Sequence, residues 1–147
     1  MDGNINGKSF DFVSLLARMV GEFYKIFGCQ TSDLGQQLID TLIELIQGPC
    51  SGNQKALISA KIIDSSRDFI AGFEKPQEFL PLGFTEEEED IDKISEFKSK
   101  FVTLLLSLLE GDLDVQKINK MANALDFNVV KDRMLAVFTI FVEKLLD

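Results

Sequence analysis

The chain has 147 residues and carries 15 Lys and Arg against 24 Asp and Glu, so its formal net charge is −9. Hydrophobic residues make up 46% of the chain and charged residues 27%, which is typical of a folded soluble domain with a substantial core. An acidic chain with few basic clusters is a poor partner for nucleic acid or an anionic membrane surface. The absence of His excludes histidine-based catalysis and His-ligated zinc.

Cysteine content and hydropathy indicate an intracellular protein. Two cysteines, Cys29 and Cys50, are too few for a disulfide framework, which favours a reducing cytosolic compartment. The longest apolar stretch, residues 101–109, is far shorter than the roughly 20 residues of a membrane span. No secretory signal follows Met1. We therefore expect no direct membrane insertion by this chain.

Hydrophobic periodicity predicts helices throughout. The first is indicated by apolar residues at steps of three and four: Phe12, Leu16, Met19, Phe23 and Phe27. Gly28 should end it, because glycine tolerates the left-handed conformation that follows many helices. The second, capped by Ser32 or Asp33, is indicated by another apolar stripe: Leu34, Leu38, Leu42 and Leu45. Gly48-Pro49 should end it, since proline cannot continue the hydrogen-bond ladder. Ser51 or Asn53 should cap the helix that follows, and Gln54 can bond back to this loop.

A third helix is predicted over about residues 53–73, and a mobile loop with two prolines over about 74–84. The side of this helix expected to be buried carries Ile58, Ile62, Phe69 and Phe73. The acidic run that follows the loop is interpreted as a capping box, with Thr85 as N-cap and Glu88 three residues later. A cation site is the alternative for that run.

Three further helices complete the predicted fold. The fourth has a deeply buried seam: Ile94, Phe97, Phe101, Leu104 and Leu108. It ends at Gly111, and Asp112 or Asp114 opens a shorter helix that carries Val115, Ile118, Met121, Ala122 and Leu125. A last helix spans about 129–146. We therefore predict an all-α single domain over residues 1–147, with about six helices in antiparallel pairs that form an armadillo-type solenoid segment or a bundle.

Motifs for enzymatic chemistry are missing from the sequence, and we expect no enzyme. Residues 2–7 match the first half of a calcium-binding EF-hand loop, but Val13 stands where that loop needs a bidentate Glu. There is no glycine-rich phosphate loop and no nucleophile elbow.

The end of the second helix holds a candidate for cation binding. Glu44 lies in its last turn, and Gln47 follows on the same face. A helix C-terminus is partly negative and leaves carbonyls unpaired, so a carboxylate there is favourable only beside a cation or a basic side chain. Carboxylate, amide and carbonyl oxygens suit calcium, but calcium takes about 6–8 oxygens and two side chains make part of a site at best. A solvated Glu44 is the alternative.

Residues 42–54 resemble a signature of the intracellular calcium-release channels, the ryanodine and inositol trisphosphate receptors. Their RIH-associated domain carries T-E-Y-x-Q-G-P-C-x-x-N-Q, and this chain reads E-L-I-Q-G-P-C-S-G-N-Q over 44–54. Residues 105–111 (L-L-S-L-L-E-G) resemble the ryanodine-receptor branch, and residues 15–28 are similar to a stretch upstream in the family. Ile43 and Leu45 depart from the family's Thr and Tyr.

The resemblance implies a cytosolic helical module that couples ligand-binding domains to a pore and contributes part of a calcium-activation site. It implies Glu44 as a calcium ligand and Gln47 as its support, completed by residues that lie outside this chain. It also implies neighbouring domains of the same channel polypeptide as partners, a homotetramer, and a place on the cytosolic side of the endoplasmic or sarcoplasmic reticulum membrane. The alternative function is a stand-alone helical scaffold or protein-interaction domain that senses no calcium.

Overall fold

The computed structural model describes residues 5–72, 81, 83–85, 87–111 and 114–124, with the side chains of 5–11 excepted. Its elements in chain order are α1 (Ile5–Phe23), the 3-10 turn η1 (Tyr24–Ile26), α2 (Ser32–Ile46), α3 (Ser51–Ser59), α4 (Ile62–Ala71), α5 (Glu88–Leu108) and α6 (Val115–Ala124). No β-strand occurs among these residues, so the all-α prediction is confirmed. The chain divides into two compact units, residues 1–113 and 114–147, which are described separately.

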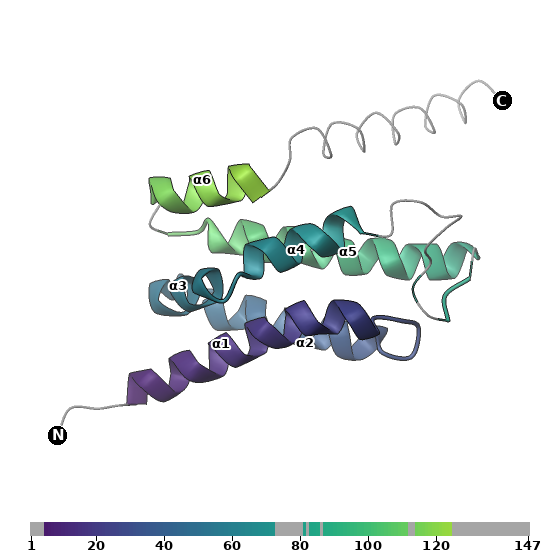
Figure 1. The fold of residues 1–147 in the computed structure, drawn as a ribbon, viewed down its shortest axis with the longest axis horizontal. Coiled ribbons are helices and arrows are strands. Elements are labelled where there is room, and N and C mark those ends of the chain that lie inside the picture. The colour runs from purple at the N-terminus through teal and green to yellow at the C-terminus, as the bar shows by residue number, and fades with distance from the viewer. Residues whose placement is uncertain (1–4, 73–80, 82, 86, 112–113, 125–147) are drawn as a thin grey trace. The chain divides into compact units, whose positions relative to one another are not determined.

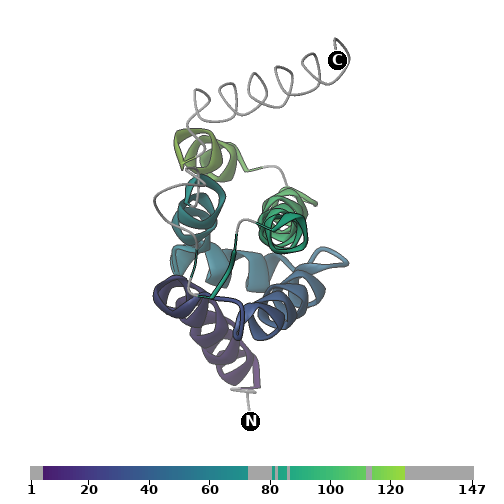
Figure 2. The same ribbon diagram turned by 90° about the vertical axis from the view of Figure 1, so that its right-hand side faces the viewer.

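Four helices of the first unit run along a common direction (Figure 1). α1 and α4 run one way, and α2 and α5 run the other, so consecutive long helices are antiparallel while α2 and α5 lie parallel. α5 packs mainly against α2 and α4. The short helix α3 lies crosswise to them at the end where α2 and α5 finish (Figures 1 and 2). The C-terminal ends of two helices far apart in the sequence therefore meet beside α3.

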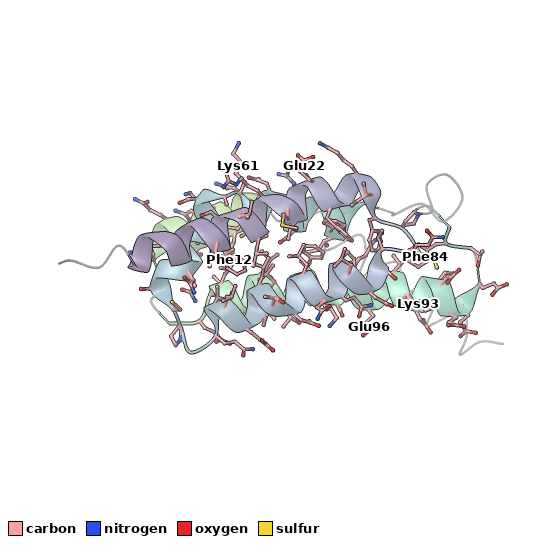
Figure 3. The ribbon with its side chains drawn as sticks, turned by 90° about the horizontal axis from the view of Figure 1, so that it is seen from below. Phe12, Glu22, Lys61, Phe84, Lys93 and Glu96 are labelled. Carbon is pink, nitrogen blue, oxygen red and sulfur yellow. The ribbon has the colours of Figure 1, made fainter. Side chains whose placement is uncertain are left out.

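Phenylalanine rings fill the centre of the first unit. Phe27 stacks on Phe97 with ring centroids 4.4 Å apart, and Phe69 stacks on Phe101 at 4.5 Å. Phe69 and Phe97 join the two stacks edge to face at 5.4 Å, a geometry that adds to the stabilisation from burying apolar area. Phe84 packs on Phe27 and extends the ring cluster towards the start of α5. Figure 3 shows Phe84 and Lys93 at this same end of the unit.

The predicted seam of α5 is confirmed, since all five of its residues are buried: Ile94, Phe97, Phe101, Leu104 and Leu108. The three-and-four spacing places these residues on one side of the helix, while Ile91, Val102 and Leu106 lie outside the seam and are exposed.

Replacing Phe97 with Ala should lower the free energy of unfolding by about 3–5 kcal/mol, because the substitution empties the space between α2, α4 and α5. Urea unfolding followed by circular dichroism measures the change. The control is Val102→Ala on the exposed side of the same helix, which should change the stability little. A loss below 1 kcal/mol for Phe97→Ala would contradict the central role of the ring cluster.

The buried faces of α1 and α2 match the predicted stripes only in part. Phe23, Phe27 and Leu42 are buried as predicted, but Phe12 and Met19 are 53% and 49% exposed, and Leu34 is exposed as well. The remaining buried positions were not predicted: Val13, Ala17, Val20, Gly35, Ile39, Ile43 and Ile46. Gly35 fixes the face of α2, because a Cβ there would collide with the Phe23 ring and lie 2.9 Å from Phe97.

The predicted third helix is two helices. The chain turns at Lys61, whose φ of 62° lies in the left-handed region, and α3 and α4 meet there at a corner. The Lys61 N–H donates to the Ile58 carbonyl at 3.1 Å, which closes α3 tightly. The predicted face is confirmed at Ile62 and Phe69, which are buried, while Ile58 is only half-buried and Phe73 lies outside the described residues.

The predicted capping box at the start of α5 is wrong. α5 begins at Glu88, and Glu87, not Thr85, holds the N-cap position without a side-chain bond. Thr85 instead donates its N–H and its hydroxyl to one carboxylate oxygen of Asp90, at 2.8 and 2.7 Å. These hydrogen bonds from Thr85, helped by the nearby charge of Lys93, lower the pKa of Asp90. A hydrogen bond to Glu89 raises the pKa of Lys93.

Because its pKa is lower in the folded state, ionised Asp90 should stabilise the protein above the ordinary Asp pKa of about 3.8 and lose that effect as the pH falls below it. Asp90→Asn should therefore lower the melting temperature at pH 7 and make little difference at pH 2.5. Thermal melts at both pH values measure this, with Asp92→Asn as a neighbouring control of equal charge change. Equal effects of the two substitutions at pH 7 would argue against the Thr85 bonds as the cause.

The second unit is described over α6, where the Asp114 carboxylate accepts the Gln116 N–H at 2.9 Å, as expected of a residue that opens a helix. The predicted loop at 74–84 lies largely outside the described residues, and the predicted last helix over 129–146 lies wholly outside them. In the part of the chain that is described, no helix is long and apolar enough to cross a membrane.

Candidate functional site

The two predicted metal ligands lie at the exposed end of α2. Glu44 is in the last turn of the helix, and Gln47 is its C-cap residue with extended backbone. Both side chains are exposed, and neither forms a hydrogen bond or ion pair with another described residue. Their oxygens therefore remain available to a cation or to another surface.

A lysine neutralises the carboxylate one turn earlier on α2 instead of Glu44. Lys100 of α5 donates to both carboxylate oxygens of Asp40, at 2.7 and 2.8 Å. The pair joins α2 to α5 and is only partly exposed on the lysine side. Lys100 is thus committed to Asp40, and Glu44 keeps its negative charge uncompensated at the partly negative end of a helix.

Pro49 creates an unmet hydrogen-bond need at the end of α2. The Leu45 carbonyl would normally accept the N–H four residues later, and Pro49 has none. The side-chain amide of Asn53 fills this place and donates to the Leu45 carbonyl at 2.7 Å. The adjacent carbonyls of Ile43 and Ile46 accept the N–H groups of Gln47 and Cys50.

Gln54 connects the same corner to the end of α5. Its side chain is 1% exposed, and its amide nitrogen donates to the Ser107 and Glu110 carbonyls at 3.2 and 3.1 Å. Both carbonyls lie where α5 ends, and the Ser107 carbonyl also accepts the Glu110 N–H at 3.3 Å. A buried amide thus satisfies two acceptors more than fifty residues away in the sequence.

Pro49, at the corner between α2 and α3, and Gly111, just after α5, provide a second contact between the ends of α2 and α5. Gly111 has a φ of 84°, and a Cβ built there would lie 2.8 Å from the Pro49 Cβ. Only glycine combines that left-handed backbone with so close an approach. Residues 44–54 and 105–111, which are separate motifs in the sequence, therefore pack against each other at the ends of α2 and α5.

Two predictions about this corner are wrong. Ser51 or Asn53 was expected to cap the helix that follows, but the N-cap residue of α3 is Cys50, and Asn53 caps α2 instead. Gln54 was expected to bond back to its own loop, but it bonds to α5. Gly48, with a φ of 81°, turns the chain as predicted.

The corner after α2 offers two exposed side chains with oxygen atoms. Glu44 contributes a carboxylate and Gln47 an amide oxygen, both of which suit calcium. Over the described ranges, no three or more His, Cys, Asp or Glu side chains gather where they could hold a metal ion. Cys29 and Cys50 are both exposed free thiols, at opposite ends of α2.

The first half of the chain matches a known family. Residues 3–70 match the family described as RyR and IP3R Homology associated, a reference to the ryanodine and inositol trisphosphate receptors. The matched range runs from α1 through most of α4 and includes Glu44, Gln47, Asn53 and Gln54, while α5 and α6 lie outside it. No solved structure shows a significant match to the chain.

Gly111→Ala should destabilise the protein more than Gly48→Ala. Both glycines have positive φ, so each substitution should cost about 1–2 kcal/mol through the backbone alone. Only at Gly111 would the new methyl group also collide with Pro49, whereas nothing lies within 4 Å of a Cβ at Gly48. Urea unfolding of the two variants measures the difference, and equal losses would mean that the corners do not press together.

Proposed function

We propose that this chain is a cytosolic helical module of an intracellular ligand-gated calcium-release channel. In this role it couples ligand and calcium sensing to the pore and contributes part of a calcium-activation site. The observation that carries the proposal is the family match over residues 3–70, which includes the corner after α2 with its exposed Glu44.

The structure supports the calcium role of Glu44 in two ways. The carboxylate is exposed and has no cationic partner among the described residues, while the nearby Lys100 pairs with Asp40. Asn53 also holds the carbonyl of the next residue, Leu45, in the last turn of α2. An incomplete ligand set is suited to an ion that bridges two domains, because the ion then binds one arrangement of the domains better than the other.

In the complete channel, calcium would contact Glu44, with Gln47 in support and the remaining oxygens supplied by other parts of the polypeptide. The module would work on the cytosolic side of the endoplasmic or sarcoplasmic reticulum membrane, within a homotetramer. In this proposal the chain is nearer the ryanodine-receptor branch, because residues 105–111 (L-L-S-L-L-E-G) resemble that branch.

A second candidate is a helical scaffold that binds a protein partner and senses no calcium. The exposed apolar face of α1 favours it, since Phe12, Leu15 and Met19 lie on one side of the helix with about half of each side chain in solvent. Calcium measurements distinguish the two candidates.

The isolated chain should bind calcium with only about millimolar affinity, because it supplies few of the oxygens that calcium needs. Glu44→Gln should weaken this binding further. Isothermal titration or chemical-shift titration measures it, and Glu96→Gln, an exposed carboxylate on α5, is the matched control. Equal binding by both variants would favour the scaffold, and submicromolar binding that depends on Glu44 would mean that the site is complete within the chain.

In a full-length channel that contains this module, Glu44→Gln should shift activation to higher calcium concentration by tenfold or more, a loss of at least about 1.4 kcal/mol in coupling. Single-channel open probability measured against calcium concentration tests this. An unchanged activation curve would remove Glu44 from the calcium site.

A further inference from the structure

We infer that Asn53 and Gln54 form a joint through which the ends of α2 and α5 move as one body. The joint consists of Pro49, Asn53, Gln54 and Gly111, together with the carbonyls of Leu45, Ser107 and Glu110. Asn53 and Gln54 are positioning residues in this scheme, because they act on Glu44 through the backbone of α2. One part of this inference rests on the proposed function, namely that calcium bound at Glu44 is what acts on the joint.

The two amides are placed to hold two helices at once. Asn53 and Gln54 are consecutive residues in the first turn of α3, where neighbouring side chains point about 100° apart. One amide therefore reaches back to the end of α2, and the other reaches across to the end of α5. α3 lies crosswise between these ends, which is what allows both contacts (Figures 1 and 2).

Breaking either contact costs hydrogen bonds at the helix ends. The backbone donor that the Leu45 carbonyl would normally use is missing at Pro49, so displacing Asn53 breaks the bond that replaces it. Gln54 is buried, so moving α5 away breaks two hydrogen bonds made by an amide that solvent hardly reaches. The contact of Pro49 with Gly111 opposes sliding of one corner over the other.

The joint also links the candidate site to the point where the chain leaves the first unit. Glu44 precedes Leu45, whose carbonyl Asn53 holds, and Glu110 and Gly111 are the last described residues before Asp114. A displacement of Glu44 by a bound cation therefore reaches the start of the connection to the second unit through a few hydrogen bonds and one close contact.

Hydrogen exchange of the 147-residue chain tests the joint without calcium. Gln54→Met keeps nearly the same side-chain volume and removes the donor. We expect the Leu109 and Glu110 amides at the end of α5, and also the Gln47 and Cys50 amides at the end of α2, to exchange about tenfold faster or more. The Gly35 amide at the far end of α2 should not change, and Gln37→Met, an exposed residue, should change none of these amides.

The result that overturns the joint is faster exchange at the end of α5 alone, or at neither end. Asn53→Ala removes the hydrogen bond on the α2 side of the joint and should speed up amide exchange at the same two helix ends. If Gln54→Met does not fold, this second variant decides the question, and loosening of the α2 end alone would overturn the inference.

A calcium arm separates this inference from the proposed function. At about 10 mM calcium, well above a millimolar dissociation constant, the unmodified chain should show slower exchange at both helix ends. Gln54→Met should then show it at the end of α2 only. If calcium slows neither end of the unmodified chain, the calcium role fails, while the calcium-free exchange still decides for or against the joint.

Discussion

The missing N–H of Pro49 is the constraint on which the end of the first unit depends. Without that donor the last turn of α2 needs a partner from elsewhere, and Asn53 supplies it from α3. This places the first turn of α3 against α2 and turns Gln54 towards α5. Gly111 can then pack on the proline ring itself. A single residue that cannot donate thus explains why three helix ends meet, and why a charged side chain stands exposed beside them.

The first unit is held together differently along its length. Its centre depends on stacked and edge-to-face rings of Phe27, Phe69, Phe97 and Phe101, which stabilise mainly by burying apolar area. Its end depends on directional hydrogen bonds from two amides. The ring cluster resists unfolding as a whole, whereas the amides determine how two helix ends are oriented. Substitutions in the ring cluster should therefore change the stability of the unit, and substitutions of the two amides should change the local order of the helix ends.

Some features were predictable from the sequence because their local pattern is compatible with only one structure. The α5 seam was predicted correctly because its three-and-four spacing runs through most of the helix, and the turn at Gly48 because glycine precedes proline there. The buried faces of α1 and α2 were not fully predictable, because large apolar residues such as Phe12 and Leu34 stand beside smaller apolar ones. Only the close packing at Gly35 decides which of them face the core. The corner at Lys61 has neither glycine nor proline to signal it. The partners of Gln54 are distant in sequence, so local pattern could not reveal them.

The brevity of α3 has a mechanical consequence. It has 9 residues, begins after a glycine–proline corner and ends at a left-handed lysine. Its first turn is held to the ends of α2 and α5 by Asn53 and Gln54, and the chain turns into α4 at Lys61. A change in the orientation of those two ends should therefore be passed through this one short helix to the start of α4.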